Sequence, residues 1–148
     1  NRLIDPNTST LNKKTFYTEN KIVGFLGEEC FLSIFPEANV VDSYDCDFEI
    51  DNKTIDIKTK YRSVPPKLYF SGAVPAYQIE TQDVYCYAFF SIMMNEDNNF
   101  VAHMCGKVEK DYFVKNAKVW KVGEVDKSNQ LEFREDTLTM TYGEMARW

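Results

Sequence analysis

Residues 44–60 read YDCDFEIDNKTIDIKTK, and apolar and polar side chains alternate along both halves of this stretch. In the first half every second residue is apolar, and the residues between are Asp or Glu; in the second half Ile55 and Ile57 continue the alternation. Side chains of a β-strand point to its two faces in turn. Residues 51–53 (DNK) have turn-forming side chains. The stretch therefore predicts a β-hairpin with one buried face.

The register of this hairpin follows from its loop. We expect a two-residue loop of Asn52 and Lys53, which gives four facing pairs: Ile50 with Ile55, Glu49 with Asp56, Phe48 with Ile57, and Asp47 with Lys58. All apolar residues then share one face, as burial of that face requires. The other face gathers Asp47, Glu49, Asp56 and Lys58. Asp47 and Asp56 become diagonal neighbours, close enough to share one ion.

The charged face predicts metal-dependent chemistry. Two crowded carboxylates repel each other unless a cation lies between them. Carboxylate oxygens are ligands that suit Mg²⁺ or Mn²⁺ better than zinc. Lys58 follows Asp56 by two residues, on the same face. From there its ammonium group can position or deprotonate a water molecule, or stabilise charge that develops on a phosphate.

The same residues resemble the signature of the PD-(D/E)XK nucleases. In that superfamily an Asp begins one strand, matched here by Asp47, and a (D/E)-x-K motif follows on the next strand, matched by residues 56–58 (DIK). Residues 24–28 (GFLGE) resemble the motif of the first helix, whose Glu often completes the metal site. The resemblance covers residues 22–60 and extends more weakly over residues 78–94. Cys46 stands where Pro is usual, and an Asp replaces the commoner Glu of the second motif.

The resemblance implies a fold and an activity. The expected fold is α/β (α+β): a restriction-endonuclease-like single domain over residues 1–148, with a central mixed sheet, a hairpin carrying the active site, and flanking helices. The expected activity is divalent-metal-dependent hydrolysis of DNA phosphodiester bonds by an endodeoxyribonuclease. The expected ligands of Mg²⁺ or Mn²⁺ are Asp47, Asp56, Glu28 and the backbone carbonyl of Ile57, with Lys58 as the catalytic lysine.

Several assignments have alternatives. Asp45 competes with Asp47 as first ligand, and Glu29 competes with Glu28, for which only the family pattern argues. Lys60 and Arg62 are candidate phosphate contacts or a solvated strand end. Gln78 is a candidate for orienting Lys58 or for contacting DNA, or an ordinary surface amide. Four aromatic residues could stack on bases or simply pack: Tyr61, Tyr69, Phe70 and Tyr77.

Other segments predict the rest of the fold. A helix should begin at Thr18 and end before Pro36, with Ile22, Leu26, Cys30 and Ile34 on one stripe. Residues 1–17 have no clear period and predict an irregular arm. We expect strands at residues 68–70, 84–94, 100–108 and 131–142, a turn at residues 95–99, and a short helix at residues 109–117.

Composition limits the class of protein. Hydrophobic residues make up 44% of the 148-residue chain, enough for one compact core. No apolar run approaches the roughly 20 residues of a membrane span, and the first residues carry no signal core, so we expect a cytoplasmic protein, such as a phage or mobile-element nuclease. The four cysteines show no CxxC pair, which favours reduced core thiols, and His103 is the only histidine.

The charge of -6 argues against binding nucleic acid through bulk electrostatics. Part of the acid lies in residues 42–56, where a metal would neutralise some of it, and residues 58–67 beside it are basic. The expected partners are DNA and a divalent metal, with a homodimer for targeting and no membrane. The alternative function is a non-catalytic nuclease-fold binding or accessory protein.

Overall fold

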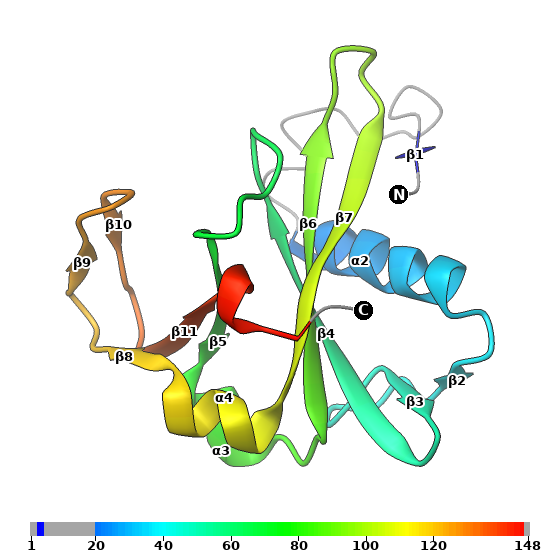
Figure 1. The fold of residues 1–148 in the computed structure, drawn as a ribbon, viewed down its shortest axis with the longest axis horizontal. Helices are drawn as coiled ribbons and strands as arrows, with labels where there is room; N and C mark the ends of the chain where they lie inside the picture. Colours follow the sequence, from blue (N-terminus) through cyan, green and yellow to red (C-terminus); the bar gives the residue numbers. More distant parts are fainter. Residues whose placement is uncertain (1–2, 5–19, 147–148) are drawn as a thin grey trace.

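A computed structural model describes residues 3–4 and 20–146 (Figure 1). Most of the arm predicted at residues 1–17, and the predicted helix cap Thr18, lie outside the described residues. Among the described residues, no helix is both long enough and apolar enough to cross a membrane. The four cysteines are buried and form no disulfide, as expected for reduced core thiols.

The main sheet has six strands in the order β1-β7-β6-β4-β3-β2. Their bounds are β1 Leu3–Ile4, β2 Asn39–Val40, β3 Phe48–Ile50, β4 Lys53–Tyr61, β6 Cys86–Met94 and β7 Phe100–Glu109. β4 and β6 are parallel, and every other neighbouring pair is antiparallel. The sheet is therefore mixed, as predicted.

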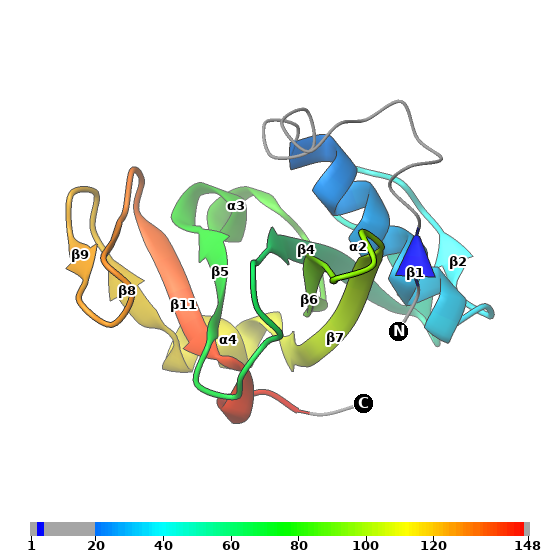
Figure 2. The same cartoon turned by 90° about the horizontal axis from the view of Figure 1, so that it is seen from above.

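Different layers cover the two faces of this sheet (Figure 2). Helix α2 (Asn20–Ile34) lies on one face. The other face packs against a three-stranded sheet in the order β5-β11-β8, together with two short helices and a 3-10 turn. The bounds of these elements are β5 Ser71–Pro75, α3 Ala76–Thr81, α4 Lys110–Asn116, β8 Lys118–Trp120, β11 Thr137–Thr141 and η2 Tyr142–Glu144. A small hairpin of β9 (Val125–Asp126) and β10 (Leu131–Glu132) projects beside it. The mixed sheet with flanking helices confirms the α+β class.

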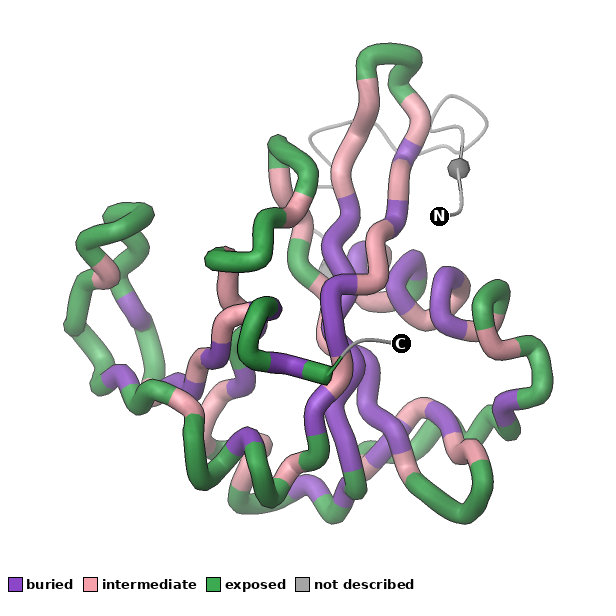
Figure 3. The backbone as a smooth tube through the Cα atoms, viewed as in Figure 1, coloured by how far each residue is buried: buried purple, intermediate pink, exposed green. Residues whose placement is uncertain are grey.

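Alternating burial along the central strands divides the core into two clusters. On the α2 face, residues such as Ile55, Ile57, Ala88 and Phe90 are buried. On the opposite face, Tyr87 and its neighbours pack against the small sheet. β6 is buried along most of its length, and the tube of Figure 3 shows burial concentrated in the central strands. The prediction of a strand buried on both faces at residues 84–94 is confirmed.

Helix α2 packs closely against β4 at one glycine. A Cβ on Gly27 would lie 2.0 Å from Oγ1 of Thr59, so the helix reaches this depth only without a side chain there. A Cβ on Gly24 would meet nothing within 4 Å. The helix ends at Ile34, two residues before Pro36, as predicted. Its buried side chains are Val23, Leu26, Cys30 and Phe31, and Ile34, predicted on the buried stripe, is 41% exposed.

The hairpin forms, but its predicted register is wrong by two residues. Phe48 pairs with Ile55, Glu49 with Thr54 and Ile50 with Lys53. The loop is Asp51 and Asn52, whose φ angles are 52° and 63°. Positive φ at both loop residues is the requirement of the tight turn that matches strand twist, and Asp and Asn adopt it more readily than Lys. The shift by two preserves which side chains share a face.

Three other predicted strands differ from the structure. The first strand of the hairpin covers Phe48–Ile50 only, because residues 41–47 fold into a loop in which Asp42 has a φ of 50°. Residues 68–70 belong to a turn that precedes β5. The long strand predicted at residues 131–142 is two strands, β10 and β11, in different sheets. The strand at residues 100–108, the turn at 95–99 and the helix at 109–117 are confirmed, within a residue or two, as β7, its preceding turn and α4.

Candidate active site

Asp47 directly precedes β3. It lies beside β4, on the edge of that strand that faces away from β6. Its backbone N–H donates to the carbonyl of Ile55 (3.0 Å), which continues the hairpin ladder by one step and sets Asp47 beside Asp56. Its side-chain Oδ2 accepts the backbone N–H of Ile57 (2.7 Å). The Asp47 carboxylate therefore accepts a backbone N–H of β4 that a backbone carbonyl of a longer β3 would otherwise accept.

The carbonyl of Ile57 belongs to the same place. In a β-strand, the N–H and C=O of one residue point to the same side of the strand. Because the N–H of Ile57 donates to Asp47, its carbonyl points toward that side too, away from β6. The predicted backbone ligand and the first predicted carboxylate thus lie at one edge of β4.

Asp56 and Lys58 lie side by side on the face of β4 that is opposite to α2. Their neighbours Ile55 and Ile57 pack toward the helix, so alternation turns Asp56 and Lys58 the other way. Nζ of Lys58 forms an ion pair with Oδ2 of Asp56 at 2.7 Å. Asp56 is only 6% exposed. Lys58 also lies 5.6 Å from the ring centre of the buried Tyr87, which forms one wall of the site.

Helix α3 supplies two amides to this ion pair. Lys58 donates to Oε1 of Gln78 and, at 3.4 Å, to Oε1 of Gln82. The side-chain amide of Gln82 donates to Oδ2 of Asp56 (3.5 Å) and to the carbonyl of Tyr44 (2.9 Å). Gln82 is buried, and Lys110 of α4 donates to its backbone carbonyl. Gln78 therefore contacts Lys58, which agrees with the alternative in which Gln78 orients Lys58.

Gln82 is the residue of this site that the sequence analysis missed. It contacts both Asp56 and Lys58, so it fixes the two side chains relative to each other. A signal was present in the sequence, because Gln82 follows Gln78 by four residues and the two share a face if the segment is helical. The segment 76–81 forms that helix, and the backbone N–H of Gln82 caps it on the carbonyl of Gln78.

Glu28 reaches the cluster from α2, on the other face of the sheet. Its carboxyl lies close enough to that of Asp47 to raise the pKa of Asp47. Asp47 also lies close enough to Asp56 to raise the pKa of Asp56. The structure thus brings together four predicted site residues: Glu28, Asp47, Asp56 and Lys58.

The carboxyl groups carry more negative charge than their surroundings compensate. Burial raises the pKa of Asp56 to about 6, and the charge of Asp47 adds to this although Lys58 opposes it. Burial also raises the pKa of Asp47 to about 6; the Ile57 N–H opposes that rise, whereas Glu28 reinforces it. Lys58 is one cation among three carboxyl groups. Such a cluster favours a further cation.

The alternative acidic residues of the sequence analysis have other surroundings in the structure. Oδ1 of Asp45 accepts the backbone N–H of Asp83 (3.0 Å), which directs this carboxylate to the loop after α3. Glu49, predicted opposite Asp56, pairs with Thr54, further toward the hairpin loop. Glu29 is half-buried on α2, and the proximity of Glu28 to Asp47 favours Glu28 over Glu29 as the predicted ligand.

Lys60 and Arg62 continue the row beyond Lys58 but have different surroundings. Lys60 is exposed at the edge of a cleft. Arg62 donates to the carbonyl of Ser71 (3.0 Å) and to the hydroxyl of Tyr142 (3.1 Å), and it lies 4.7 Å from the ring centre of Phe70. Arg62 is therefore fixed by the small sheet and is not a freely solvated strand end.

The donor set of the site fits a hard divalent cation. Carboxylates and a backbone carbonyl are the oxygen ligands that Mg²⁺ and Mn²⁺ take. In the part of the chain that the structure describes, no three His, Cys, Asp or Glu side chains already stand as a metal-binding cluster. Lys58 and Gln82 instead engage Oδ2 of Asp56.

Comparison of the chain with protein-family models, with curated proteins and with solved structures finds no match.

Proposed function

We propose that this protein is a divalent-metal-dependent endodeoxyribonuclease of the PD-(D/E)XK kind, with a restriction-endonuclease-like fold. One observation carries the proposal. Asp47, which directly precedes β3, lies close enough to Asp56 of β4 for each carboxyl to shift the pKa of the other, and Lys58 forms an ion pair with Asp56. This is the arrangement of side chains that the sequence signature implies.

The residues that would hold Mg²⁺ or Mn²⁺ are Asp47, Asp56, the carbonyl of Ile57 and Glu28. The position of three carboxyl groups beside one lysine supports this assignment, and burial, the largest cause, raises the pKa of both Asp carboxyls. When bound, such an ion polarises a phosphate and lowers the pKa of a coordinated water molecule. The N–H of Ile57 fixes the orientation of the Asp47 carboxylate, which holds one ligand in position before any ion binds.

Lys58 would orient the attacking water and stabilise charge on the phosphate. Gln78 and Gln82 hold its ammonium group, and the ring of Tyr87 lies beside it. A lysine fixed in this way acts from one position, which is the condition for electrostatic stabilisation of a transition state. We place Gln78 and Gln82 in a positioning role, because their contacts are to Lys58 and Asp56.

A second candidate is a nuclease-fold protein that binds nucleic acid or a protein partner without cleavage. The observation in its favour is the ion pair itself, because Lys58 and Gln82 both contact Oδ2 of Asp56 and so compete for it with a metal ion. A second copy of the chain or a partner protein for targeting is compatible with either candidate.

Cleavage of end-labelled DNA tests the proposal. Both single-stranded and duplex oligonucleotides should be supplied with Mg²⁺ or Mn²⁺ and, separately, with EDTA. We expect metal-dependent internal cuts by the parent protein and none by Asp56→Asn, which removes one anionic ligand while keeping the shape of the side chain. Metal binding without cleavage of any DNA would instead favour the non-catalytic candidate.

A further inference from the structure

A cleft of about 690 Å³ opens beyond Lys60, between the connection from β4 to β5 and the β9–β10 hairpin. Figure 1 shows the hairpin and this connection rising on either side of β5 and β11. Lys60 lines the cleft and lies two residues along the same face of β4 as Lys58. The cleft therefore begins roughly 7 Å along the strand from the candidate catalytic lysine.

One wall of the cleft presents stacked cationic and aromatic groups. Arg62 lies over the ring of Phe70, and the rings of Phe70 and Tyr69 meet edge to face at 5.1 Å. Tyr69 is 74% exposed, the highest value among the large hydrophobic side chains in the described part of the chain. An exposed tyrosine supported by a second ring offers a flat surface on which a nucleic-acid base can stack.

Two cationic side chains, Lys60 and Arg62, line the cleft. Partial loss of water around Lys60 lowers the pKa of its ammonium group, and the charge of Arg62 lowers it further, whereas Asp126 opposes the shift. Asp126 comes from the hairpin and accepts hydrogen bonds from the backbone N–H (3.0 Å) and the hydroxyl (2.7 Å) of Ser128. A phosphate between Lys60 and Arg62 would relieve their mutual repulsion.

The opposite wall presents polar side chains. The hairpin contributes Ser128, Asn129 and Gln130 to the lining. Amides and hydroxyls of this kind read the hydrogen-bonding edges of bases that are not paired with another strand. The cleft thus combines a surface on which a base can stack, two cations that can contact a phosphate, and polar groups that can hydrogen-bond the edge of a base.

We propose that this cleft binds the unpaired nucleotides of a single-stranded segment of the substrate, next to the scissile bond. The proposal rests on the proposed nuclease function and specifies its substrate class. Bases in a duplex have both faces covered by their neighbours, so only an unpaired base can stack on Tyr69. A volume of this size is also that of a pocket for one or a few small groups, not of a groove for a duplex.

Binding measured without metal separates this inference from cleavage. The probe is a fluorescein-labelled oligothymidylate of about twelve nucleotides, followed by fluorescence anisotropy in EDTA, with a blunt duplex as competitor. Tyr69→Ala should weaken binding by about tenfold or more, the scale of one stacking contact. Lys60→Gln should weaken binding and reduce the slope of log affinity against log salt by about 0.7, the value for one phosphate contact on a single strand.

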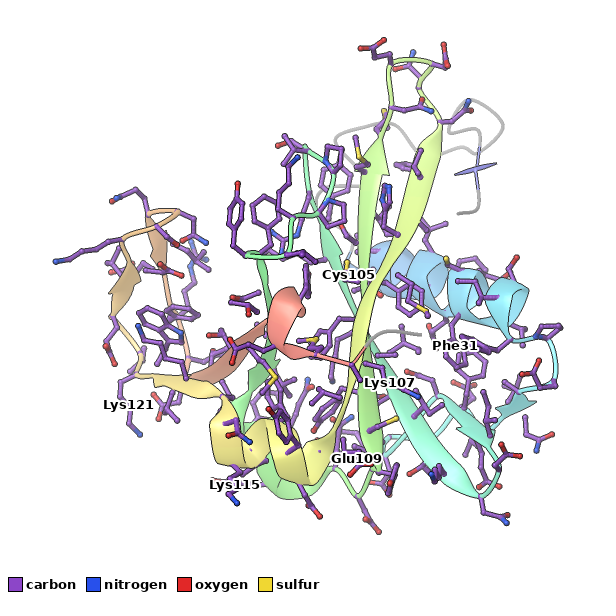
Figure 4. All side chains as sticks on the ribbon, in the orientation of Figure 1. Phe31, Cys105, Lys107, Glu109, Lys115 and Lys121 are labelled. Carbon is purple, nitrogen blue, oxygen red and sulfur yellow. The ribbon has the colours of Figure 1, made fainter. Side chains whose placement is uncertain are left out.

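Two matched variants control for general effects on charge and surface. Tyr112→Ala removes another exposed tyrosine, and Lys115→Gln another exposed lysine, both on α4. In Figure 4, Lys115 projects from α4 at the bottom of the view, whereas the hairpin that borders the cleft rises at the left. Both control variants should bind the oligothymidylate as the parent does.

Each outcome decides one of the two proposals. Parental binding by Tyr69→Ala and Lys60→Gln would overturn the inference and leave the nuclease function intact. Competition by the duplex as strong as that by an unlabelled single strand would overturn the inference in the same way. Binding that depends on the cleft, with no cleavage in Mg²⁺ or Mn²⁺, would uphold the inference and reject the nuclease function.

Discussion

The two ends of one face of β4 carry opposite charge. Around Asp56 three carboxyl groups share one lysine, whereas Lys60 and Arg62, a few residues further on, lie together and have Asp126 to oppose them. In both places a like charge nearby shifts a pKa in the direction that disfavours the charged form. The pKa of Asp56 is raised to about 6, and the pKa of Lys60 is lowered. Each end therefore favours a ligand of the opposite charge: a metal cation at the first and a phosphate at the second.

This contrast would let a chain of net charge -6 bind nucleic acid in the way proposed above. The net charge describes the whole surface, whereas binding depends on the charges that line the path of the substrate. Substitutions at the acidic end should abolish catalysis and leave binding of single strands. Substitutions at the basic end should weaken binding of single strands and so raise the DNA concentration that cleavage requires.

The largest effect is expected at the acidic end, from Asp47→Asn. This change removes an anionic metal ligand beside Asp56, so cleavage should fall by more than the roughly 10- to 100-fold that follows loss of a group that only orients a ligand. Asp45→Asn is the matched control, because Asp45 accepts the N–H of Asp83 and faces another loop. Cleavage rates at saturating DNA would measure both. Loss of activity in Asp45→Asn, with Asp47→Asn active, would reassign the first ligand.

Lys58→Ala should reduce cleavage by about 10²-fold, the scale on which a positioned catalytic group acts. Its affinity for Mn²⁺ should persist or rise, because the variant loses the cation that competes for Asp56. Removal of that cation should also lower the free energy of unfolding of the metal-free protein. Single-turnover cleavage and calorimetric titration with Mn²⁺ give the two quantities. An active Lys58→Ala would make Lys58 a structural counter-ion, with Lys60 as the next candidate.

Gly27→Ala tests how rigidly α2 holds Glu28 beside the site. The added methyl group would meet Thr59, so the helix must shift, and we expect a loss of about 1–3 kcal/mol in the free energy of unfolding. Gly24→Ala is the control on the same helix. Its methyl group enters open space, so it should stabilise the protein by up to about 1 kcal/mol through the higher helix propensity of Ala. Urea denaturation of both variants measures the difference. Equal stability of the two would show that α2 and β4 are not in close contact at Gly27.

The smallest effect concerns the pH dependence of the metal-free protein. The pKa of Asp56 rises from 3.8 to about 6 on folding, so the folded state binds its proton more tightly than the unfolded state. The contribution of Asp56 to stability is therefore present below about pH 4 and is lost as the pH rises through about 6. Asp56→Asn should gain Tm over the parent at about pH 7.5 in EDTA, lose about half of that gain at about pH 5, and lose most of it at about pH 4. A gain in Tm that does not depend on pH would mean that folding does not raise the pKa of Asp56.

The parts of the fold that local patterns specify could be predicted from the sequence. Alternation of apolar residues locates β4 and places Asp56 and Lys58 on one face whatever the register. A continuous apolar run locates β6, and the turn that follows it locates β7. The register itself depends on the φ preferences of Asp51 and Asn52, which a count of apolar residues does not include. Glu28 could be proposed only from the resemblance, because helical periodicity does not distinguish it from Glu29.

The small sheet could not be predicted, because its pairings join distant parts of the chain. Thr141 pairs with Ser71 and Thr139 with Lys118, and no local pattern specifies these partners. The cleft depends on this sheet and on the hairpin beside it, so it too was invisible in the sequence. Gln82 was missed for a related reason: its role depends on α3, a helix too short to show a period.

Diffraction from crystals soaked in Mn²⁺, recorded for anomalous scattering, tests the metal site most directly. The account predicts an anomalous peak between the carboxylates of Asp47 and Asp56, at ligand distances of roughly 2.0–2.2 Å, with Lys58 displaced from Oδ2 of Asp56. The same soak of Asp56→Asn crystals should show a much weaker peak or none. A parent crystal with no peak at this site, or with Mn²⁺ bound equally well after Asp56→Asn, would contradict the account.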